Sequence, residues 1–315
     1  MREWQVTLHK LKKNKKILVT GGAGFIGSHL ADDLIRLGYD LTIVDDLSTG
    51  NIKNVNKKAR FMKLDLGSPG ATKILINILK GIDYVFHLAT IPRIQYCTEN
   101  PVEAHNSNVN GTLNLLKACA TNNNIKKFIQ ISTCMVYGNS DQLTISEDEP
   151  KRPKTMYGTQ KYIQELYVIA YTKLYGLPSV ILRYFGVYGT KRHSESGSYP
   201  NVTAAFARDK RTKNKLCIYG DGKQSRDFVH VFDIIKATIL AMKSKFVDAE
   251  VFNIGTGKPV TINEIAQYYE CLIEYKKARP DDVRYCTANI KKAKKLLKWQ
   301  PRISFDEGIK GYLNQ

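Results

Sequence analysis

The residues best suited to acid–base chemistry are a tyrosine and a lysine four positions apart, Tyr157 and Lys161. On a helix this spacing places both side chains on one face. An ammonium group beside a phenol stabilises the phenolate, which lowers the pKa of the phenol from its reference value of about 10. The pair therefore predicts a general base that removes a proton from a hydroxyl group. YxxxK pairs also occur by chance on surface helices. Whether this pair is functional therefore depends on the motifs that precede it in the sequence.

Two hydroxyl residues lie at the end of a predicted strand that precedes Tyr157 in the sequence. The apolar segment 127–132 (KFIQIS) leads into Ser132-Thr133, and Tyr137-Gly138 follows. In open α/β sheets, ligands bind at the carboxyl ends of the strands. This order of strand-end hydroxyl, aromatic residue and YxxxK favours a functional site over two unrelated surface residues.

A glycine motif follows a short apolar segment (KILVT) near the start of the chain. Gly21, Gly24 and Gly27 have the spacing GxxGxxG. The first glycine permits a tight turn, the second lets the backbone approach a pyrophosphate, and the third lets a helix pack close to the strand. The helix that opens at Phe25-Ile26 presents free N–H groups to that anion. The motif predicts a dinucleotide site.

A second predicted strand ends in Asp45-Asp46, about 20 residues after the glycine motif. A carboxylate at this position hydrogen-bonds the hydroxyls of the adenosine ribose. Asp45 fits this role and would repel a 2′-phosphate. The predicted cofactor is therefore NAD rather than NADP.

Strand-like and helix-like segments alternate along the first two thirds of the chain. Such alternation is typical of a parallel sheet covered by helices on both faces. The predicted strands are 16–20, 41–44, 60–64, 83–88, 127–132 and 179–183, and the predicted helices are 25–37, 71–79, 101–121 and 157–175.

After residue 185 the strand-like and helix-like segments no longer alternate regularly, which predicts that the chain divides into two parts. We expect residues 1–14 to form a basic tail and residues 15–185 a cofactor-binding domain, to which residues 228–256 return. Residues 186–227 and 257–315 are expected to form a smaller substrate-binding lobe.

The composition excludes several other classes of protein. The 315 residues are 43% hydrophobic and 24% charged, as in ordinary globular proteins. The net charge of +19 comes from dispersed lysines without a nucleic-acid-binding motif, so we expect no nucleic-acid partner. The six cysteines contain no CxxC pair, which argues against a metal site or a disulfide framework. Without a long apolar run or a signal sequence, we expect no membrane association and a cytoplasmic location.

Taken together, these motifs resemble the extended short-chain dehydrogenase/reductases, and in particular the NAD-dependent epimerases and dehydratases similar to UDP-glucose 4-epimerase. Further segments that match are 87–89, 108–112, 182–185, 220–222, 226–228, 253–255 and 279–282. The resemblance covers residues 15–311. It implies a Rossmann-type, doubly wound parallel sheet with a smaller C-terminal substrate-binding lobe, and a homodimer formed through helices 101–121 and 157–175.

The resemblance also implies roles for individual residues. Tyr157 is the base on the sugar hydroxyl, and Thr133, with Ser132 as a neighbour that could share the task, bonds the reacting oxygen. The implied cofactor contacts are Gly21, Gly24, Phe25, Ile26, Gly27, Asp45, Asp65, Leu66, Leu88, Ala89, Asn108, Tyr157 and Lys161. The implied substrate contacts are Thr133, Tyr157, Asn201, Tyr219, Arg226, Arg279 and Cys286. Of these, Arg226 and Arg279 would bind the pyrophosphate, and Tyr219 could equally be a core residue.

The residues before Tyr137 favour one reaction of this family. Dehydratases and decarboxylases carry a glutamate two residues before this tyrosine, and dehydratases an aspartate one position earlier. Met135 and Cys134 stand there, and methionine cannot titrate. We therefore expect 4-epimerisation of a UDP-hexose through a transient 4-keto sugar.

The identity of the sugar stays open at this stage. By the resemblance, Cys286 lines up with a position that is bulky and aromatic in epimerases restricted to UDP-Glc and UDP-Gal and small in those that also admit N-acetyl sugars. A cysteine there implies room for UDP-GlcNAc and UDP-GalNAc as well. Gly186 and the segment 90–93 (TIPR) differ from UDP-galactose epimerases, and the excess positive charge suits a uronic acid. UDP-glucuronate epimerisation is therefore an alternative, as are a nucleotide-sugar oxidoreductase or dehydratase and a non-catalytic NAD-sensing module.

Overall fold

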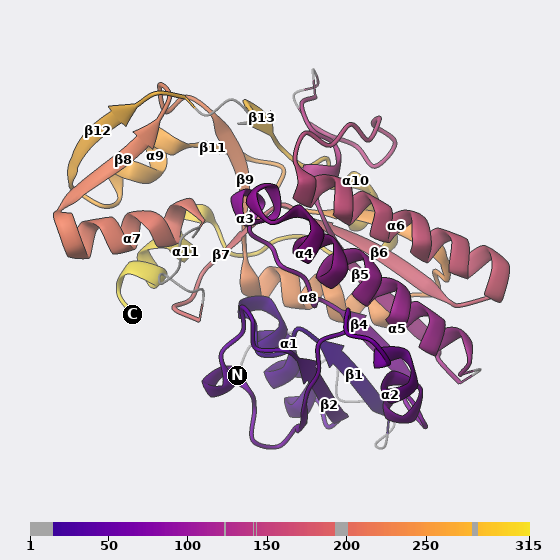
Figure 1. The fold of residues 1–315 in the computed structure, drawn as a ribbon. Coiled ribbons are helices and arrows are strands. Elements are labelled where there is room, and N and C mark those ends of the chain that lie inside the picture. Colours follow the sequence, from indigo (N-terminus) through magenta and orange to yellow (C-terminus); the bar gives the residue numbers. More distant parts are fainter. Residues whose placement is uncertain (1–14, 123, 141, 143, 193–200, 279–282) are drawn as a thin grey trace.

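The computed structural model describes residues 15–122, 124–140, 142, 144–192, 201–278 and 283–315. The predicted tail 1–14 and the predicted substrate contact Arg279 lie outside these residues. Seven parallel strands form the large sheet in the order β10-β6-β5-β4-β1-β2-β3 (Figure 1). They are β1 (Lys16–Thr20), β2 (Asp40–Asp45), β3 (Arg60–Lys63), β4 (Tyr84–His87), β5 (Lys127–Thr133), β6 (Ser179–Tyr184) and β10 (Asp248–Ile254).

Helices cover both faces of this sheet, which confirms the predicted fold class. Their apolar sides pack against a sheet whose strands β5 and β6 are buried along their whole length, as expected for a parallel sheet. One face carries α1 (Phe25–Arg36) and α8 (Val231–Lys243), and the other carries α2 (Ala71–Ile78), α5 (Gly111–Ala120) and α6 (Met156–Tyr175). Figure 1 shows α5 and α6 side by side.

The helix predicted over residues 101–121 is interrupted in the structure. It consists of α4 (Pro101–His105), a π-helical turn (Asn106–Asn110) and α5, preceded by a short α3 (Ile94–Glu99) that the sequence did not predict. A π turn inserts one extra residue into a helix and often marks a functional site. Here it turns Asn108 into the protein, where this side chain is fully buried.

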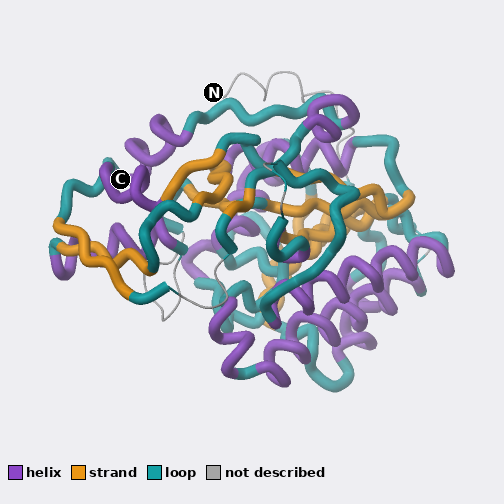
Figure 2. The backbone as a smooth tube through the Cα atoms, turned by 90° about the horizontal axis from the view of Figure 1, so that it is seen from above, coloured by secondary structure: helices purple, strands orange, loops and turns teal. Residues whose placement is uncertain are grey.

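A second group of elements lies beside the large sheet. Figure 2 shows strands running through the middle of the molecule and further strands at its left edge. The smaller sheet contains β7 (Gly186–Tyr188), β9 (Ser225–His230), β11 (Pro259–Thr261) and β13 (Tyr285–Cys286), and a two-stranded sheet pairs β8 (Lys215–Tyr219) with β12 (Leu272–Lys276). The helices are α7 (Val202–Lys213), α9 (Ile262–Gln267), α10 (Lys291–Leu296) and α11 (Phe305–Leu313). Of these, α10 contacts β10 and therefore packs against the large sheet.

A buried ion pair ties α6 to the carboxyl ends of the sheet strands. Arg183 of β6 donates from Nη2 and Nε to the two carboxylate oxygens of Glu165, at 2.7 and 2.9 Å, and both side chains are at most 3% exposed. Its Nη1 donates to the hydroxyl of Tyr137 at 2.7 Å, and this hydroxyl donates to Asn253 of β10 at 2.7 Å. The network fixes the segment that follows β5.

Replacing Glu165 by glutamine removes the negative charge and leaves the Arg183 guanidinium uncompensated in the core. We expect the free energy of unfolding in urea to fall by about 3–5 kcal/mol. The control is Asp306→Asn, which breaks an exposed pair with Lys310 on α11 and should leave the urea midpoint unchanged. Equal effects of the two substitutions would contradict this account.

Candidate active site

A long cleft of about 2110 Å³ lies at the carboxyl ends of the large-sheet strands. One wall contains the glycine turn, the ends of β2, β4 and β5, and the start of α6. The other wall contains α7, β8 and β9. Of the predicted site residues, the cleft is lined by Gly21, Gly24, Phe25, Ile26, Gly27, Asp45, Asp65, Leu66, Leu88, Ala89, Thr133, Tyr157, Lys161, Asn201, Tyr219 and Arg226.

The glycine turn leaves no room for side chains. Gly21 has a φ of +71°, which favours glycine. A β-carbon on Gly27 would lie 2.1 Å from the carbonyl oxygen of Gly21, so this glycine lets α1 approach the turn. Gly24 caps α1 without a side-chain hydrogen bond. The first N–H groups of α1 are therefore available to an anion in the cleft.

Asp45 at the end of β2 shapes the same part of the cleft. Its carboxylate accepts hydrogen bonds from the backbone N–H groups of Ala23 and Leu47, both at 2.9 Å. Burial raises the pKa of this carboxyl group, and the two backbone bonds partly offset the rise. Each oxygen keeps a lone pair for a further donor, so the group can both hold the turn and accept a ribose hydroxyl.

The π turn places Asn108 behind the cleft wall rather than on it. Its Oδ1 accepts from the N–H of Ile91 at 2.7 Å and from the hydroxyl of Thr90 at 2.9 Å, and its Nδ2 donates to Gln160 at 2.7 Å. Asn108 therefore joins the loop after β4 to α6. We propose that it positions this loop and has no direct contact with the cofactor.

Tyr157 and Thr133 meet at the end of β5. Both residues line the cleft, and each is 9% exposed. Burial raises the pKa of Tyr157 well above its usual value, while the hydroxyl of Thr133 lowers it in part. Ser132, predicted as a neighbour of the reacting oxygen, instead donates its hydroxyl to Glu165.

Lys161 lines the cleft one helical turn beyond Tyr157, but its effect differs from the prediction. Its ammonium donates to the carbonyl of Ile131 at 2.9 Å and to Gln164 at 3.0 Å. Burial lowers the pKa of Lys161 to about 7. The predicted lowering of the Tyr157 pKa by this lysine is wrong for the protein without bound ligands, because burial of the phenol has the larger effect.

The second wall supplies the predicted substrate contacts. Arg226 of β9 lines the cleft, and the next residue, Asp227, is fully buried and accepts four hydrogen bonds from residues 256, 257 and 288. This carboxylate fixes the strand that carries Arg226. Asn201 caps α7 through its side chain, and Tyr219 at the end of β8 is 36% exposed. Cys286 lies behind this wall and is 3% exposed.

Several cationic cleft residues escaped the sequence prediction. Arg93, Lys191 and Arg192 come from irregular segments, and Arg208 and Arg211 come from α7, and all five line the cleft. Their positive charge was visible in the sequence, but no periodic pattern placed them on this wall.

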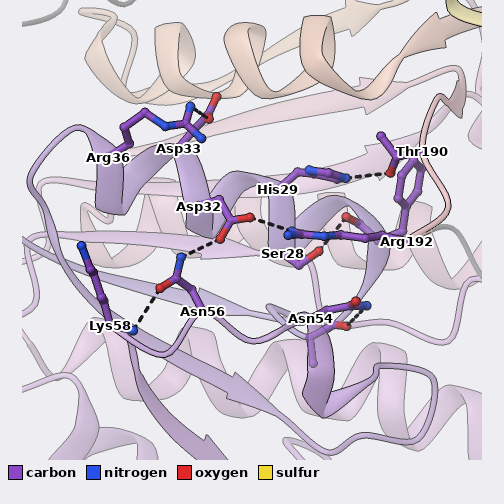
Figure 3. A network of polar contacts seen from close by, with 12 residues as sticks. Ser28, His29, Asp32, Asp33, Arg36, Asn54, Asn56, Lys58, Thr190 and Arg192 are labelled. Atoms are coloured by element: carbon purple, nitrogen blue, oxygen red, sulfur yellow. Dashed lines mark hydrogen bonds and ion pairs between the residues drawn. The ribbon is translucent and has the colours of Figure 1, made fainter. Parts of the chain in front are cut away.

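A polar network holds the segment after β7 against α1 (Figure 3). Arg192 pairs with Asp32 at 2.7 Å, and the hydroxyl of Thr190 bonds the ring of His29 at 2.8 Å. Asp32 also accepts from Asn56 at 2.7 Å. The network joins the start of the second group of elements to the helix that follows the glycine turn.

In the part of the chain that the structure describes, no group of three or more His, Cys, Asp or Glu side chains could hold a metal ion. Within the same residues, no helix has the length and apolar character needed to cross a bilayer. All six cysteines are free thiols.

The fold and this cleft define a dinucleotide-dependent enzyme of the extended short-chain type. Residues 17–255 match the sequence model of the NAD-dependent epimerase/dehydratase family, and the chain belongs to this family. Both the turn that excludes side chains and the uncapped start of α1 fit the pyrophosphate of NAD, the cofactor of this family.

The chain is similar to several proteins that act on UDP-sugars. It is 36% identical to the UDP-glucose 4-epimerase of Thermotoga maritima, solved with UDP-glucose, over 95% of this chain and 97% of that one, with a TM-score of 0.89. It is 35% identical to the UDP-N-acetylglucosamine 4-epimerase of Methanobrevibacter ruminantium, solved with UDP-N-acetylmuramic acid, over 96% and 98%, also with a TM-score of 0.89. A UDP-N-acetyl-α-D-glucosaminuronate decarboxylase of Bacillus cytotoxicus is 33% identical over 94% of this chain and 96% of its own length.

Replacing Gly27 by alanine should weaken NAD binding by at least about tenfold, because the new β-carbon would push the turn away from the pyrophosphate. Calorimetric titration with NAD measures the effect. The control is Gly311→Ala on α11, where a β-carbon meets no atom within 4 Å. Unchanged NAD affinity in Gly27→Ala would show that the dinucleotide binds elsewhere.

The lowered pKa of Lys161 predicts a pH-dependent contribution to stability. Between a folded pKa of about 7 and the ordinary value in the unfolded chain, the unfolded chain binds the proton more tightly. Stability therefore rises with pH. Relative to Lys161→Met, the free energy of unfolding of the wild type should rise by about 2 kcal/mol from about pH 6 to about pH 9. A constant difference across this range would contradict the burial of an ionisable amine here.

Proposed function

We propose that this protein is an NAD-dependent 4-epimerase of a UDP-hexose, which interconverts UDP-Glc and UDP-Gal and also UDP-GlcNAc and UDP-GalNAc. One observation carries the proposal. Tyr157, Thr133 and Lys161 line the same cleft as the glycine turn, and the neighbouring residues Cys134 and Met135 offer no carboxylic acid.

In this reaction Tyr157 accepts the proton of the 4-hydroxyl group and later returns it. Thr133 holds the sugar oxygen in reach, and the buried ammonium of Lys161 orients the nicotinamide ribose. When bound, NAD supplies a hydride acceptor and donor for C4 and, in its oxidised form, a positive charge that favours the phenolate.

The second wall anchors the diphosphate while the sugar changes face. Arg226 lies on a strand held by the buried carboxylate of Asp227, so its guanidinium has a fixed base from which to bind phosphate. The 4-keto sugar is flat at C4 and must turn about its link to the diphosphate to receive the hydride on its other face. A fixed diphosphate and a free sugar are what this reaction requires.

Elimination of water or carbon dioxide would need other groups at the sugar end. Loss of water needs a general acid and a general base near C5 and C6. The segment between Thr133 and Tyr137 carries Cys134, Met135 and Val136. The 33% identity with the Bacillus cytotoxicus decarboxylase therefore does not make decarboxylation the better proposal here.

A second candidate is 4-epimerisation of UDP-glucuronate. Arg93 lines the cleft in the loop after β4, close in sequence to Ile91, which packs in the same cluster as Tyr157. Within the described residues, Arg93 has no ion-pair partner. A guanidinium of this kind could pair with the carboxylate of a uronic acid.

Incubation of the purified protein with UDP-Glc, UDP-GlcNAc and UDP-GlcA, each followed by NMR of the products, tests the proposal. We expect the neutral sugars to be epimerised at C4 without consumption of added NADH. Turnover of UDP-GlcA alone, abolished in Arg93→Ala, would establish the second candidate instead. No change in any sugar with NAD bound would overturn both.

Replacing Tyr157 by phenylalanine should lower the rate at least about a thousandfold, because the general base is lost, while NAD affinity stays within about threefold. The matched control is Tyr167→Phe, on the same helix but outside the cleft. A Tyr157→Phe variant with full activity would show that another group removes the proton.

We also infer a homodimer built from α4, α5 and α6. Of these helices, α4 and α6 carry large apolar side chains that a single chain leaves in water, among them Val102 (82% exposed), Leu166 (48%) and Leu174 (75%). Light scattering should give twice the mass of one chain, and Leu166→Glu should shift the protein toward monomer. A wild-type mass of one chain would contradict the inference.

A further inference from the structure

Gln164 is a fully buried residue of α6 that the proposed reaction does not use. Its Oε1 accepts a hydrogen bond from the ammonium of Lys161 at 3.0 Å and another from Nε2 of Gln130 at 2.9 Å. Its Nε2 donates to the backbone carbonyl of Asn108 in the π turn. The amide cannot be reversed, because its N–H groups would then face the ammonium and its oxygen would face the carbonyl. The orientation of this side chain is therefore fixed at both ends.

The position of Gln164 determines the direction of one N–H bond of Lys161. An ammonium group has three hydrogens, which point in tetrahedral directions. The carbonyl of Ile131, at 2.9 Å, and Oε1 of Gln164 take two of them, and they are the only hydrogen-bond acceptors of this ammonium among the described residues. Two fixed directions also fix the third. Because Lys161 lines the cleft, a ligand in the cleft can engage this third hydrogen.

The Asn108 carbonyl is itself held from the side of the large sheet. The hydroxyl of Thr112 donates to the same oxygen at 2.6 Å, so this hydroxyl must accept from Nε2 of His87, which lies at 2.9 Å. Burial lowers the pKa of His87 to about 3, and Nδ1 of the neutral ring accepts from the hydroxyl of Thr20 at 2.7 Å. Thr20 directly precedes the glycine turn. One chain of buried hydrogen bonds therefore runs from this turn through the π turn to the lysine of α6.

We propose that Gln164 is a positioning residue, which directs the third N–H bond of Lys161 into the cleft and anchors the lysine to the π turn. The inference rests on the proposed function, in which Lys161 orients the nicotinamide ribose. Without the amide, the ammonium keeps one acceptor and can rotate at the end of a flexible four-carbon stem. The ribose is then held less firmly, and the nicotinamide is not kept in the geometry that hydride transfer needs.

Replacing Gln164 by methionine keeps the length of the side chain and removes its hydrogen bonds. In calorimetric titrations of the full-length protein, NAD affinity should fall at least about tenfold, as expected when a charged donor loses its acceptor. The matched control is Gln130→Met, which removes a second fully buried amide from the same cluster but no bond to Lys161 or to the Asn108 carbonyl. This control should bind NAD within about threefold of the wild type. Equal losses in the two variants would overturn the proposal.

Gln164→Glu tests whether the acceptor is what matters. In either protonation state a carboxyl group keeps an oxygen that can accept from Lys161, so NAD affinity should recover to within about threefold of the wild type. An affinity as low as that of Gln164→Met, in protein that is folded by circular dichroism, would contradict the assigned role. If the methionine variant does not fold, Gln164→Leu, which also lacks donor and acceptor, takes its place in the comparison.

Epimerisation gives a second measurement, which separates this inference from the proposed function. With NAD and UDP-sugar both saturating, kcat should fall at least about tenfold in Gln164→Met and stay within about threefold in Gln130→Met. Saturation restores occupancy of the cleft but not the direction of the ammonium. If the wild type turns over no UDP-sugar, the proposed function fails, while the NAD affinities still decide the role of Gln164. An unchanged kcat in Gln164→Met would show that this residue does not position the lysine for the reaction.

Discussion

The position of the proposed base depends on a polar seam between α6 and β5. Along one face of the helix, Lys161 donates to the carbonyl of Ile131, Gln164 accepts from Gln130 at 2.9 Å, and Glu165 accepts from the hydroxyl of Ser132. These contacts are buried, so each unpaired partner would incur a desolvation cost. Tyr157 stands one turn before this seam and is held by the same register. A helix with an apolar inner face could slide along the sheet more easily than this one can.

The seam also explains why the buried face of α6 can be polar. Its buried face contains Gln160, Lys161, Gln164 and Glu165, residue types that are usually exposed. Only their partners on β5, β6 and the π turn make their burial acceptable. Such partners lie far away in the sequence, so the pattern of a single helix cannot reveal them. The spacing from Tyr157 indicated Lys161 in the sequence, but nothing indicated that Gln164 and Glu165 are also buried.

Features encoded over short distances were predicted well. The strand over residues 16–20 has the predicted bounds, and the glycine turn follows from local backbone requirements. Long-range features were not predicted. The π turn that buries Asn108 and the cationic residues of the cleft near Lys191 arise only when separate segments meet. The acidity of Tyr157 was misjudged for the same reason, because its burial depends on residues 91–104 that pack over it.

The contacts between α1 and the segment after β7 have a kinetic consequence. Lys191 borders the cleft between two anchored neighbours, Thr190 and Arg192, which are fastened to His29 and Asp32 on the helix that follows the glycine turn (Figure 3). The segment after β7 is thus held against α1, beside the glycine turn. This connection would slow the departure of a dinucleotide from the cleft. Long retention would suit the proposed epimerisation, in which the cofactor is regenerated in every cycle.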